Sequence, residues 1–189
     1  NLSKGRLGEE NSSFLGSMFI TKIKQAGMQR ASLPEKDRHD FYLYVDEFHN
    51  LVTETFENIL SEARKYALCL TVAHQYVGQL LPRVQAAVLG NTGSIIIFRV
   101  GGEDAERLEP EMEPIFKVKD MINLGMQEFY IKMTIDGETY DPFSAETLKV
   151  LPAPHGSFKD KIVAASRRKY SIPADAAKKL IQEEEATIF

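Results

Sequence analysis

The chain has 189 residues, of which 43% are hydrophobic, 10% aromatic and 26% charged, as in an ordinary globular domain that folds without a disulfide or metal. Its 23 Lys and Arg against 27 Asp and Glu give a net charge of −4, so any DNA contact would have to come from a local basic loop. One cysteine and four scattered histidines exclude a disulfide framework and a zinc-type cluster. No apolar run approaches the roughly 20 residues that span a membrane.

The first residues, NLSKGRLG (1–8), are typical of a strand exit followed by a glycine-containing turn, and we expect the strand itself to lie upstream in a longer protein. From Glu9 to Arg30, apolar residues recur at steps of three and four and predict an amphipathic helix. The predicted inner stripe of this helix consists of Leu15, Met18, Phe19, Ile23 and Ala26.

A strand–helix–strand unit is predicted next. Phe41–Val45 is apolar or aromatic without alternation, which is typical of a strand buried on both faces of a parallel sheet. Thr53 or Thr55 is a candidate N-cap for a helix that ends near Tyr66. The inner face of that helix is predicted to hold Phe56, Ile59, Leu60 and Ala63. Leu68–Ala73 is a second buried strand, which makes the unit a parallel β-α-β crossover.

Further along, the pattern predicts a short helix, a third buried strand and another helix, at Pro82–Leu89, Ser94–Phe98 and Glu103–Glu109. Beyond Pro114, two weakly alternating segments flank Asp136-Gly137, a hairpin turn signal, and predict an antiparallel edge to the parallel sheet. These segments are Gln127–Ile135 and Glu138–Phe143.

A proline-rich linker, Pro152-Ala153-Pro154, leads to two charged helices, Ser157–Tyr170 and Pro173–Glu185. The predicted fold is therefore α/β, with a mostly parallel sheet, helices on both faces, an antiparallel edge hairpin and a helical C-terminal tail. Residues 1–151 would form the main domain, and residues 152–189 the linker and tail.

Polar residues follow the predicted strands at their carboxyl ends, where open parallel sheets bind ligands. An apolar strand that ends in Asp46-Glu47 is the Walker B arrangement, in which the Asp holds Mg²⁺ and the Glu polarises the water that attacks the γ-phosphate. The alternative is an acidic pair that caps the next helix. Gln75 follows the second strand and is placed to touch both the γ-phosphate and the attacking water, unless it is a loop glutamine without a partner.

Arg64 lies near the end of the predicted helix between these two strands, about 90° from the apolar stripe at 100° per residue. It therefore flanks the core and can point out of the domain. Such an arginine suits two roles, an arginine finger for a neighbouring subunit or a cation that complements the helix dipole.

Three segments together resemble the TraG/TraD-like coupling ATPases of conjugative type IV secretion, within the HerA/FtsK motor superfamily. They are FYLYVDEF (41–48), ILSEARKY (59–66) and LTVAHQY (70–76). The opening NLSKGRLG and the stretch FRVGGEDAE (98–106) are also similar to that family. The resemblance runs in register over roughly residues 1–145.

The resemblance implies the C-terminal part of a RecA-like P-loop ATPase that forms a homo-hexameric ring, threads DNA through its channel and uses ATP and Mg²⁺. Asp46 would be the metal residue, Glu47 the catalytic carboxylate, Gln75 the nucleotide sensor and Arg64 the finger acting in trans. Arg99, after the third strand, would be a second intersubunit or sensor arginine near the nucleotide. The implied partners are type IV secretion channel and relaxosome proteins. The implied location is the cytoplasm, at the inner face of the cell membrane, with membrane association through upstream segments only.

The phosphate-binding signature G-x-x-x-x-G-K-[ST] does not occur in this sequence. We expect it upstream, and we expect these 189 residues alone not to hydrolyse ATP. Two other classes stay open. One comprises related motors, such as a HerA/FtsK-type DNA pump of repair or segregation or a peptide-secretion ATPase, and the other is a non-catalytic interaction module of a secretion complex. A two-metal hydrolase or nuclease is disfavoured, because neither neighbouring strand ends in a further carboxylate.

Overall fold

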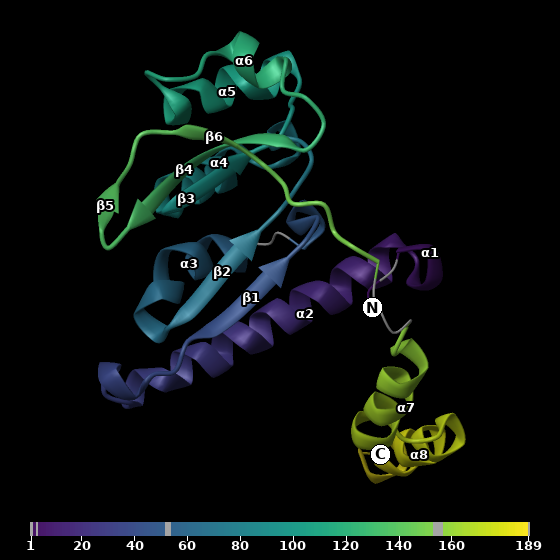
Figure 1. Ribbon diagram of the computed structural model, residues 1–189. Coiled ribbons are helices and arrows are strands. Elements are labelled where there is room, and N and C mark those ends of the chain that lie inside the picture. Colours follow the sequence, from purple (N-terminus) through teal and green to yellow (C-terminus); the bar gives the residue numbers. More distant parts are fainter. Residues whose placement is uncertain (1, 3, 52–53, 153–156, 189) are drawn as a thin grey trace. The chain divides into compact units, whose positions relative to one another are not determined.

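The computed structural model describes all residues except 1, 3, 52–53, 153–156 and 189. It divides the chain into two compact units, Asn1–Thr147 and Leu148–Phe189. The first unit is a mixed α/β structure with two small sheets, and the second is helical (Figure 1).

The first unit begins with two helices, α1 (Lys4–Leu7) and α2 (Glu9–Met28). The predicted strand exit is therefore wrong for Lys4–Leu7, while Asn1 and Ser3 lie outside the described residues. Gly8 joins the two helices with φ at 80°, a left-handed conformation that glycine adopts without steric cost.

The inner face of α2 differs from the predicted stripe, except at Ile23, which packs against the main core as predicted. Leu15, Met18 and Phe19 are 36%, 47% and 60% exposed. The buried residues of α2 are instead Ser12, Gly16, Ile20 and Gly27. Three of them are small, and Ile20 directly follows the exposed Phe19. A Cβ on Gly16 would lie 2.2 Å from Leu51 Cδ2, so the helix approaches its neighbour through a residue without a side chain. Apolar periodicity cannot detect such a contact, because it counts only large residues.

Two 3₁₀ turns, η1 (Gln29–Ser32) and η2 (Glu35–Asp37), lead from α2 into the predicted β-α-β unit. Its elements are β1 (Phe41–Val45), η3 (Phe48–Asn50), α3 (Glu54–Glu62), η4 (Ala63–Tyr66) and β2 (Leu68–Val72). The two strands pair in parallel, from Phe41↔Leu68 to Val45↔Val72, which confirms the predicted crossover. Thr53 lies outside the described residues, and α3 already begins one residue before Thr55.

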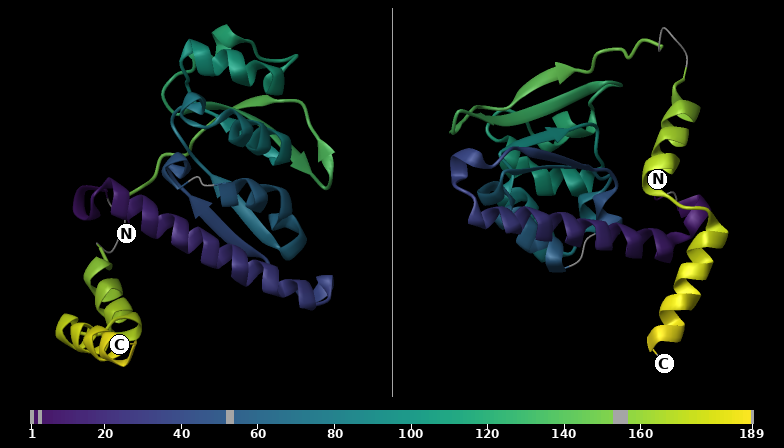
Figure 2. Two further views of the ribbon diagram at one scale, coloured as in Figure 1. Left: turned by 180° about the vertical axis from the view of Figure 1, so that it is seen from behind. Right: turned by 90° about the horizontal axis from the view of Figure 1, so that it is seen from below.

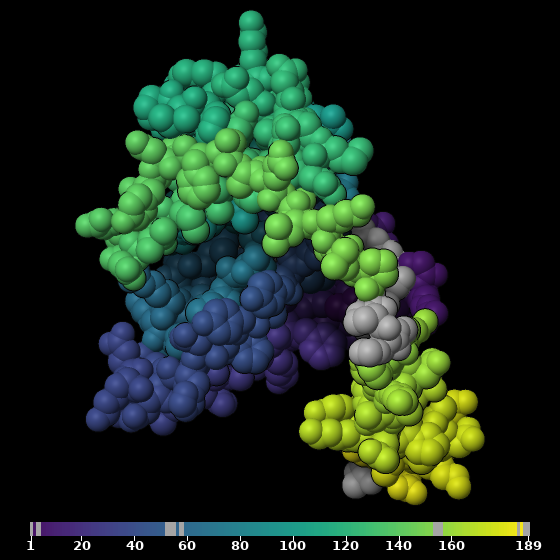
Figure 3. Space-filling view, viewed as in Figure 1, coloured from purple at the N-terminus to yellow at the C-terminus, as the bar shows by residue number. Residues whose placement is uncertain are grey.

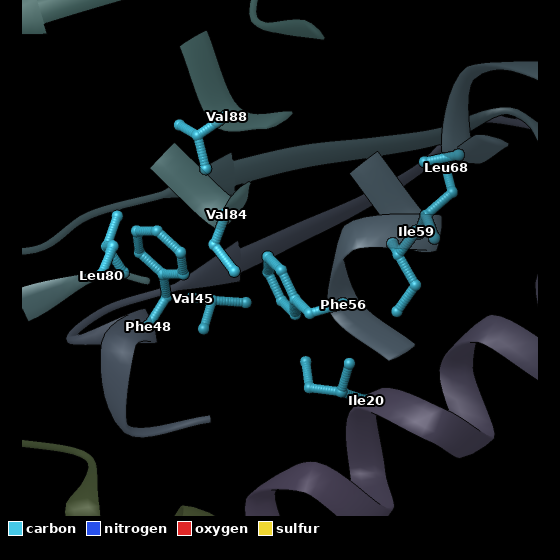
Figure 4. Packing of buried hydrophobic residues seen from close by; sticks show 10 residues of the cluster. Ile20, Val45, Phe48, Phe56, Ile59, Leu68, Leu80, Val84 and Val88 are labelled. Atoms are coloured by element: carbon cyan, nitrogen blue, oxygen red, sulfur yellow. The ribbon is translucent and has the colours of Figure 1, made fainter. Parts of the chain in front are cut away.

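The main core lies between α3, α4 and one face of the two parallel strands (Figure 4). Phe56, Ile59 and Ala63 of the α3–η4 segment are buried there, as predicted, and Leu60 packs at its margin. Figures 1 and 2, seen from opposite sides, show α3 over a single face of the strands. On the other face, Tyr42 and Tyr44 are 62% and 72% exposed, so the prediction of a strand buried on both faces is wrong.

A second sheet follows, and it is antiparallel. After η5 (Val77–Gln79), its strands are β3 (Ser94–Ile97), β4 (Glu128–Ile135), β5 (Glu138–Thr139) and β6 (Phe143–Glu146). The helix α4 (Pro82–Asn91) precedes β3, and the helices α5 (Gly102–Met112) and α6 (Val118–Ile122) lie between β3 and β4 in the chain. β4 pairs antiparallel with β3, β5 and β6 and is therefore central. The predicted turn is confirmed, with φ of 52° at Asp136 and 86° at Gly137.

For the described residues, the prediction of one mostly parallel sheet with an antiparallel edge is confirmed only in part: β1 and β2 are parallel and the hairpin is antiparallel, but they belong to two separate sheets. The isoleucine-rich strand β3 pairs with β4 and not with the parallel strands, and its Ile96 is 54% exposed. A short apolar run is compatible with either kind of pairing, because both bury part of the strand. β2 and β3 each form an edge of their own sheet, and the space-filling view shows a recess between the blue surface around β1 and the green surface around β4 and β6 (Figure 3).

The second unit contains α7 (Lys159–Tyr170) and α8 (Ala174–Ile188), which are the two predicted tail helices. Of the predicted linker, Ala153 and Pro154 lie outside the described residues. No helix in the part of the chain that the structure describes is long and apolar enough to cross a membrane.

Candidate functional site

Two carboxylates follow the carboxyl end of β1. Asp46 is exposed, and its Oδ1 accepts the backbone N–H of Glu47 at 2.9 Å. Glu47 has φ 49° and ψ 42°, a left-handed conformation that is uncommon for a residue with a side chain and that clusters at functional sites. Asn50 Nδ2 donates to the Glu47 carbonyl at 3.1 Å, which supports this sharp turn.

Gln75 reaches Glu47 from the end of the neighbouring strand. Its Nε2 donates a hydrogen bond of 2.7 Å to Glu47 Oε1. Backbone hydrogen bonds continue the pairing beyond the strands, from Ala73 N to the Val45 carbonyl at 2.9 Å and from Phe48 N to the Ala73 carbonyl at 3.1 Å. Glu47 and Gln75 therefore meet because β1 and β2 are parallel neighbours, whose carboxyl ends lie side by side.

Two histidines and a phenylalanine pack behind the carboxylate. Phe48 is fully buried, and its ring contacts that of His74 edge to face at a centroid distance of 4.8 Å. His49 Nδ1 lies 3.4 Å from Glu47 Oε2, although it has no hydrogen-bond partner among the described residues. Burial lowers the pKa of His74, the imidazole of His49 lowers it further, and Asp104 and Glu47 act in the opposite direction. The fold therefore favours a neutral His74.

Asp104, in the first turn of α5, is a residue that we did not predict for this site. It is 7% exposed, and its carboxylate accepts two backbone N–H groups, from Val77 and Gly78, each at 3.2 Å. These groups lie two and three residues after Gln75. An acidic residue early in a helix is a common dipole partner, so the sequence carried no signal that separated this aspartate from an ordinary one.

The structure brings neither predicted arginine to the carboxylates. Arg64 is exposed in η4, at the amino end of β2, whereas Gln75 follows the carboxyl end of that strand. Arg99 is exposed just after β3, and no hydrogen bond or ion pair joins it to another described residue.

A groove of about 480 Å³ lies between α2 and β1, and Asp46 and Glu47 are among the residues that line it. Its walls are mostly apolar, with Phe19, Ile20 and Tyr44 among them. Within the described residues, no three His, Cys, Asp or Glu side chains converge as a metal-binding group. The carboxylate oxygens of Asp46 and Glu47 in the lining of the groove are hard donors of the kind that Mg²⁺ prefers.

No family model and no curated protein sequence matches this chain. Solved structures of the plasmid coupling protein TrwB do match it. TrwB in complex with the non-hydrolysable ATP analogue ADPNP gives a TM-score of 0.58 over 78% of this chain, at 15% identity. The chain shares the fold of part of TrwB.

Two other TrwB structures give similar TM-scores. The complex with ADP and Mg²⁺ gives a TM-score of 0.53 over 67% of this chain at 16% identity, and an unbound form gives 0.51 over 64% at 15%. The chain spans only 34% to 40% of the length of these TrwB chains. At this level of identity, the likeness concerns the fold alone.

Proposed function

We propose that this chain is the water-activating part of an ATP-driven motor that moves DNA in conjugative transfer. The observation that carries the proposal is the hydrogen bond of 2.7 Å between Gln75 and Glu47, at the edge where two parallel strands end and beside Asp46. A carboxylate paired with an amide at this edge is suited to hold and polarise a water. The TrwB fold supports the proposal, since TrwB has been seen with an ATP analogue and with ADP and Mg²⁺.

Each residue at this edge has a proposed role. Glu47 acts as the general base for the attacking water, and Gln75 orients that water and senses the γ-phosphate. Asp46 is an Mg²⁺ ligand, because its exposed carboxylate has one oxygen on the Glu47 N–H and keeps the other for a cation. When bound, Mg²⁺ neutralises charge on the phosphate oxygens.

Arg64 is proposed to act on the site of a neighbouring subunit in a homo-hexameric ring. A strand of five residues, β2, separates it from Gln75, and such a strand is about 16 Å long. An arginine side chain cannot cover that length, so Arg64 cannot serve the carboxylates of its own chain. Its exposure leaves it available to another subunit. Arg99 is proposed as a second intersubunit or sensor arginine on the basis of its position after β3 alone.

The phosphate-binding loop is proposed to come from chain outside these 189 residues. The sequence lacks the G-x-x-x-x-G-K-[ST] signature, and the chain spans 34% to 40% of TrwB. Among the described residues, β2 and β3 each form an edge of their own sheet, and Figure 3 shows a recess in the surface of the first unit; both observations support the proposal. DNA in a ring channel, relaxosome and secretion-channel partners, and a place at the inner membrane face through other segments belong to the same proposal.

The test is ATP hydrolysis by the complete protein that contains this chain, with and without DNA. We expect DNA-stimulated turnover by that protein and none by the 189-residue chain alone. Turnover by the chain alone would contradict the division of the site between two segments. A complete protein that binds no nucleotide would overturn the motor and favour an interaction module of a secretion complex. Transfer of plasmid DNA in a mating assay separates conjugation from a repair or segregation pump.

A further inference from the structure

We propose that Asp104 is a positioning residue that holds the loop after β2 so that Gln75 stays against Glu47. This inference rests on the proposed function, because it assigns a new residue to the same site. Asp104 is 58 residues away from Asp46 in the sequence and lies on α5, whose other buried residues belong to the second core.

Both carboxylate oxygens of Asp104 accept hydrogen bonds from this loop. Oδ2 accepts the Val77 N–H and Oδ1 accepts the Gly78 N–H, both at 3.2 Å, and the side chain is almost fully buried. Hydrogen bonds to an ionised group are roughly twice as strong as neutral ones. Removing the acceptor would leave two N–H groups in a poorly solvated place without partners, which is costly.

The loop is anchored on both sides of Gln75. Before it, Ala73 donates to the Val45 carbonyl at 2.9 Å and accepts from Phe48 N–H at 3.1 Å. After it, Val77 is bound by Asp104 and is itself 8% exposed in the second core. Only three residues, 74–76, lie between these anchors, so the position of the Gln75 side chain depends on both.

A second contact supports the same loop from α4. Gln85 Nε2 donates to the carbonyls of Val77 and Leu80, at 3.0 Å and 2.7 Å. Asp104 therefore accepts hydrogen bonds from two N–H groups of this loop, and Gln85 donates hydrogen bonds to two of its carbonyls. Because Asp104 sits on α5 and Gln75 reaches Glu47, this loop links the antiparallel part of the unit to the carboxylates.

The test compares Asp104→Asn, Gln75→Ala and the double variant in the complete protein, by kcat and KM for ATP. Asp104→Asn is expected to lower kcat about 10-fold or more, because small misplacements of catalytic groups are costly, and to change KM by less than about 2-fold. In the Gln75→Ala background it is expected to lower kcat by less than about 2-fold, because it acts through Gln75. The inference would be overturned if Asp104→Asn left kcat unchanged. It would also be overturned if Asp104→Asn lowered kcat by the same factor with and without Gln75→Ala.

The matched control is Asp120→Asn, since Asp120 Oδ2 likewise accepts a backbone N–H, from Lys117 at 2.8 Å, but at the start of α6. It is expected to leave kcat unchanged, and an equal loss of kcat there would mean a general effect on the fold. Asp104→Glu, which keeps both carboxylate oxygens but displaces them by one methylene, replaces Asp104→Asn if the latter does not fold.

A second readout does not depend on ATP. In the complete protein, Asp104→Asn leaves a single acceptor oxygen for the two N–H groups, so it is expected to speed amide hydrogen exchange at Val77 or Gly78 about 10-fold or more, with Leu108 unchanged. Unchanged exchange at both amides would overturn the inference. If Glu47→Gln and Gln75→Ala leave turnover unaltered, the proposed function fails, and the exchange result decides on its own whether Asp104 holds the loop.

Discussion

Gln75 donates a hydrogen bond of 2.7 Å to the carboxylate of Glu47, although 28 residues separate the two in the sequence. The contact exists because β1 and β2 are parallel neighbours in register, from Phe41↔Leu68 to Val45↔Val72. Backbone hydrogen bonds around Ala73 extend this register to the loops that carry both side chains. The geometry places a general-base candidate, Glu47, and an orienting amide, Gln75, together at the carboxyl ends of β1 and β2.

The first prediction concerns the carboxylate itself. In the complete protein, Glu47→Gln is expected to lower the turnover of ATP about 10²-fold or more, because general-base assistance is typically worth that much. The binding of an ATP analogue, measured by calorimetry, is expected to stay within about 2-fold, because the amide keeps the size of the side chain. Glu106→Gln, an exposed position on α5, is the control. Normal turnover by Glu47→Gln would remove Glu47 from the mechanism.

The second prediction tests the action of Arg64 across subunits. Arg64→Ala and Glu47→Gln proteins are each expected to be nearly inactive alone, whereas rings assembled from a mixture are expected to recover part of the activity. The reason is that the Glu47→Gln subunit still supplies Arg64 to the intact site of its neighbour. Lys65→Ala, in the same exposed turn, is the control. A mixture as inactive as its parts, or a monomeric form that loses as much activity on Arg64→Ala, would refute the in-trans role.

The third prediction concerns acid sensitivity. Burial holds the pKa of His74 below its ordinary 6.5, so at pH values below 6.5 the unfolded chain binds more protons at this group than the folded chain does. His74 therefore costs the fold stability as the pH falls through that range, and costs nothing above it.

His74→Phe keeps a ring against Phe48 and removes the titration. Its loss of Tm between roughly pH 7.5 and pH 5.5 is expected to be smaller than that of the unaltered chain. His39→Asn, at an exposed position, is the control. Identical pH dependence for the His74→Phe variant and the unaltered chain would show that His74 does not contribute.

The fourth prediction compares the same substitution in two helices. Gly16→Ala would place a Cβ 2.2 Å from Leu51 Cδ2, so we expect it to destabilise the fold by about 1–3 kcal/mol through overpacking. Gly90→Ala meets no atom within 4 Å, so we expect it to stabilise α4 by about 0.5–1 kcal/mol through helix propensity. Urea unfolding of the 189-residue chain measures both changes. Equal signs for the two would mean that α2 does not pack through Gly16.

The features that could be predicted from the sequence are those that depend on segments close to one another along the chain. The apolar runs at 41–45 and 68–72 and the helix between them specified a parallel crossover, and Asp136-Gly137 specified its hairpin turn. The same crossover determined that Glu47 and Gln75 would share an edge. The roles of these two residues, and those of Asp46, Arg64 and Arg99, remain predictions.

Which surfaces pack together could be seen only in the folded structure. β3 became part of an antiparallel sheet, α2 turned Gly16 and not Phe19 inward, and Asp104 bound the loop after Gln75. Periodicity reports which face of an element is apolar, but it does not say which partner covers that face. Contacts between distant residues arise when whole elements pack, and a helix can approach its partner most closely at a residue that carries no side chain at all.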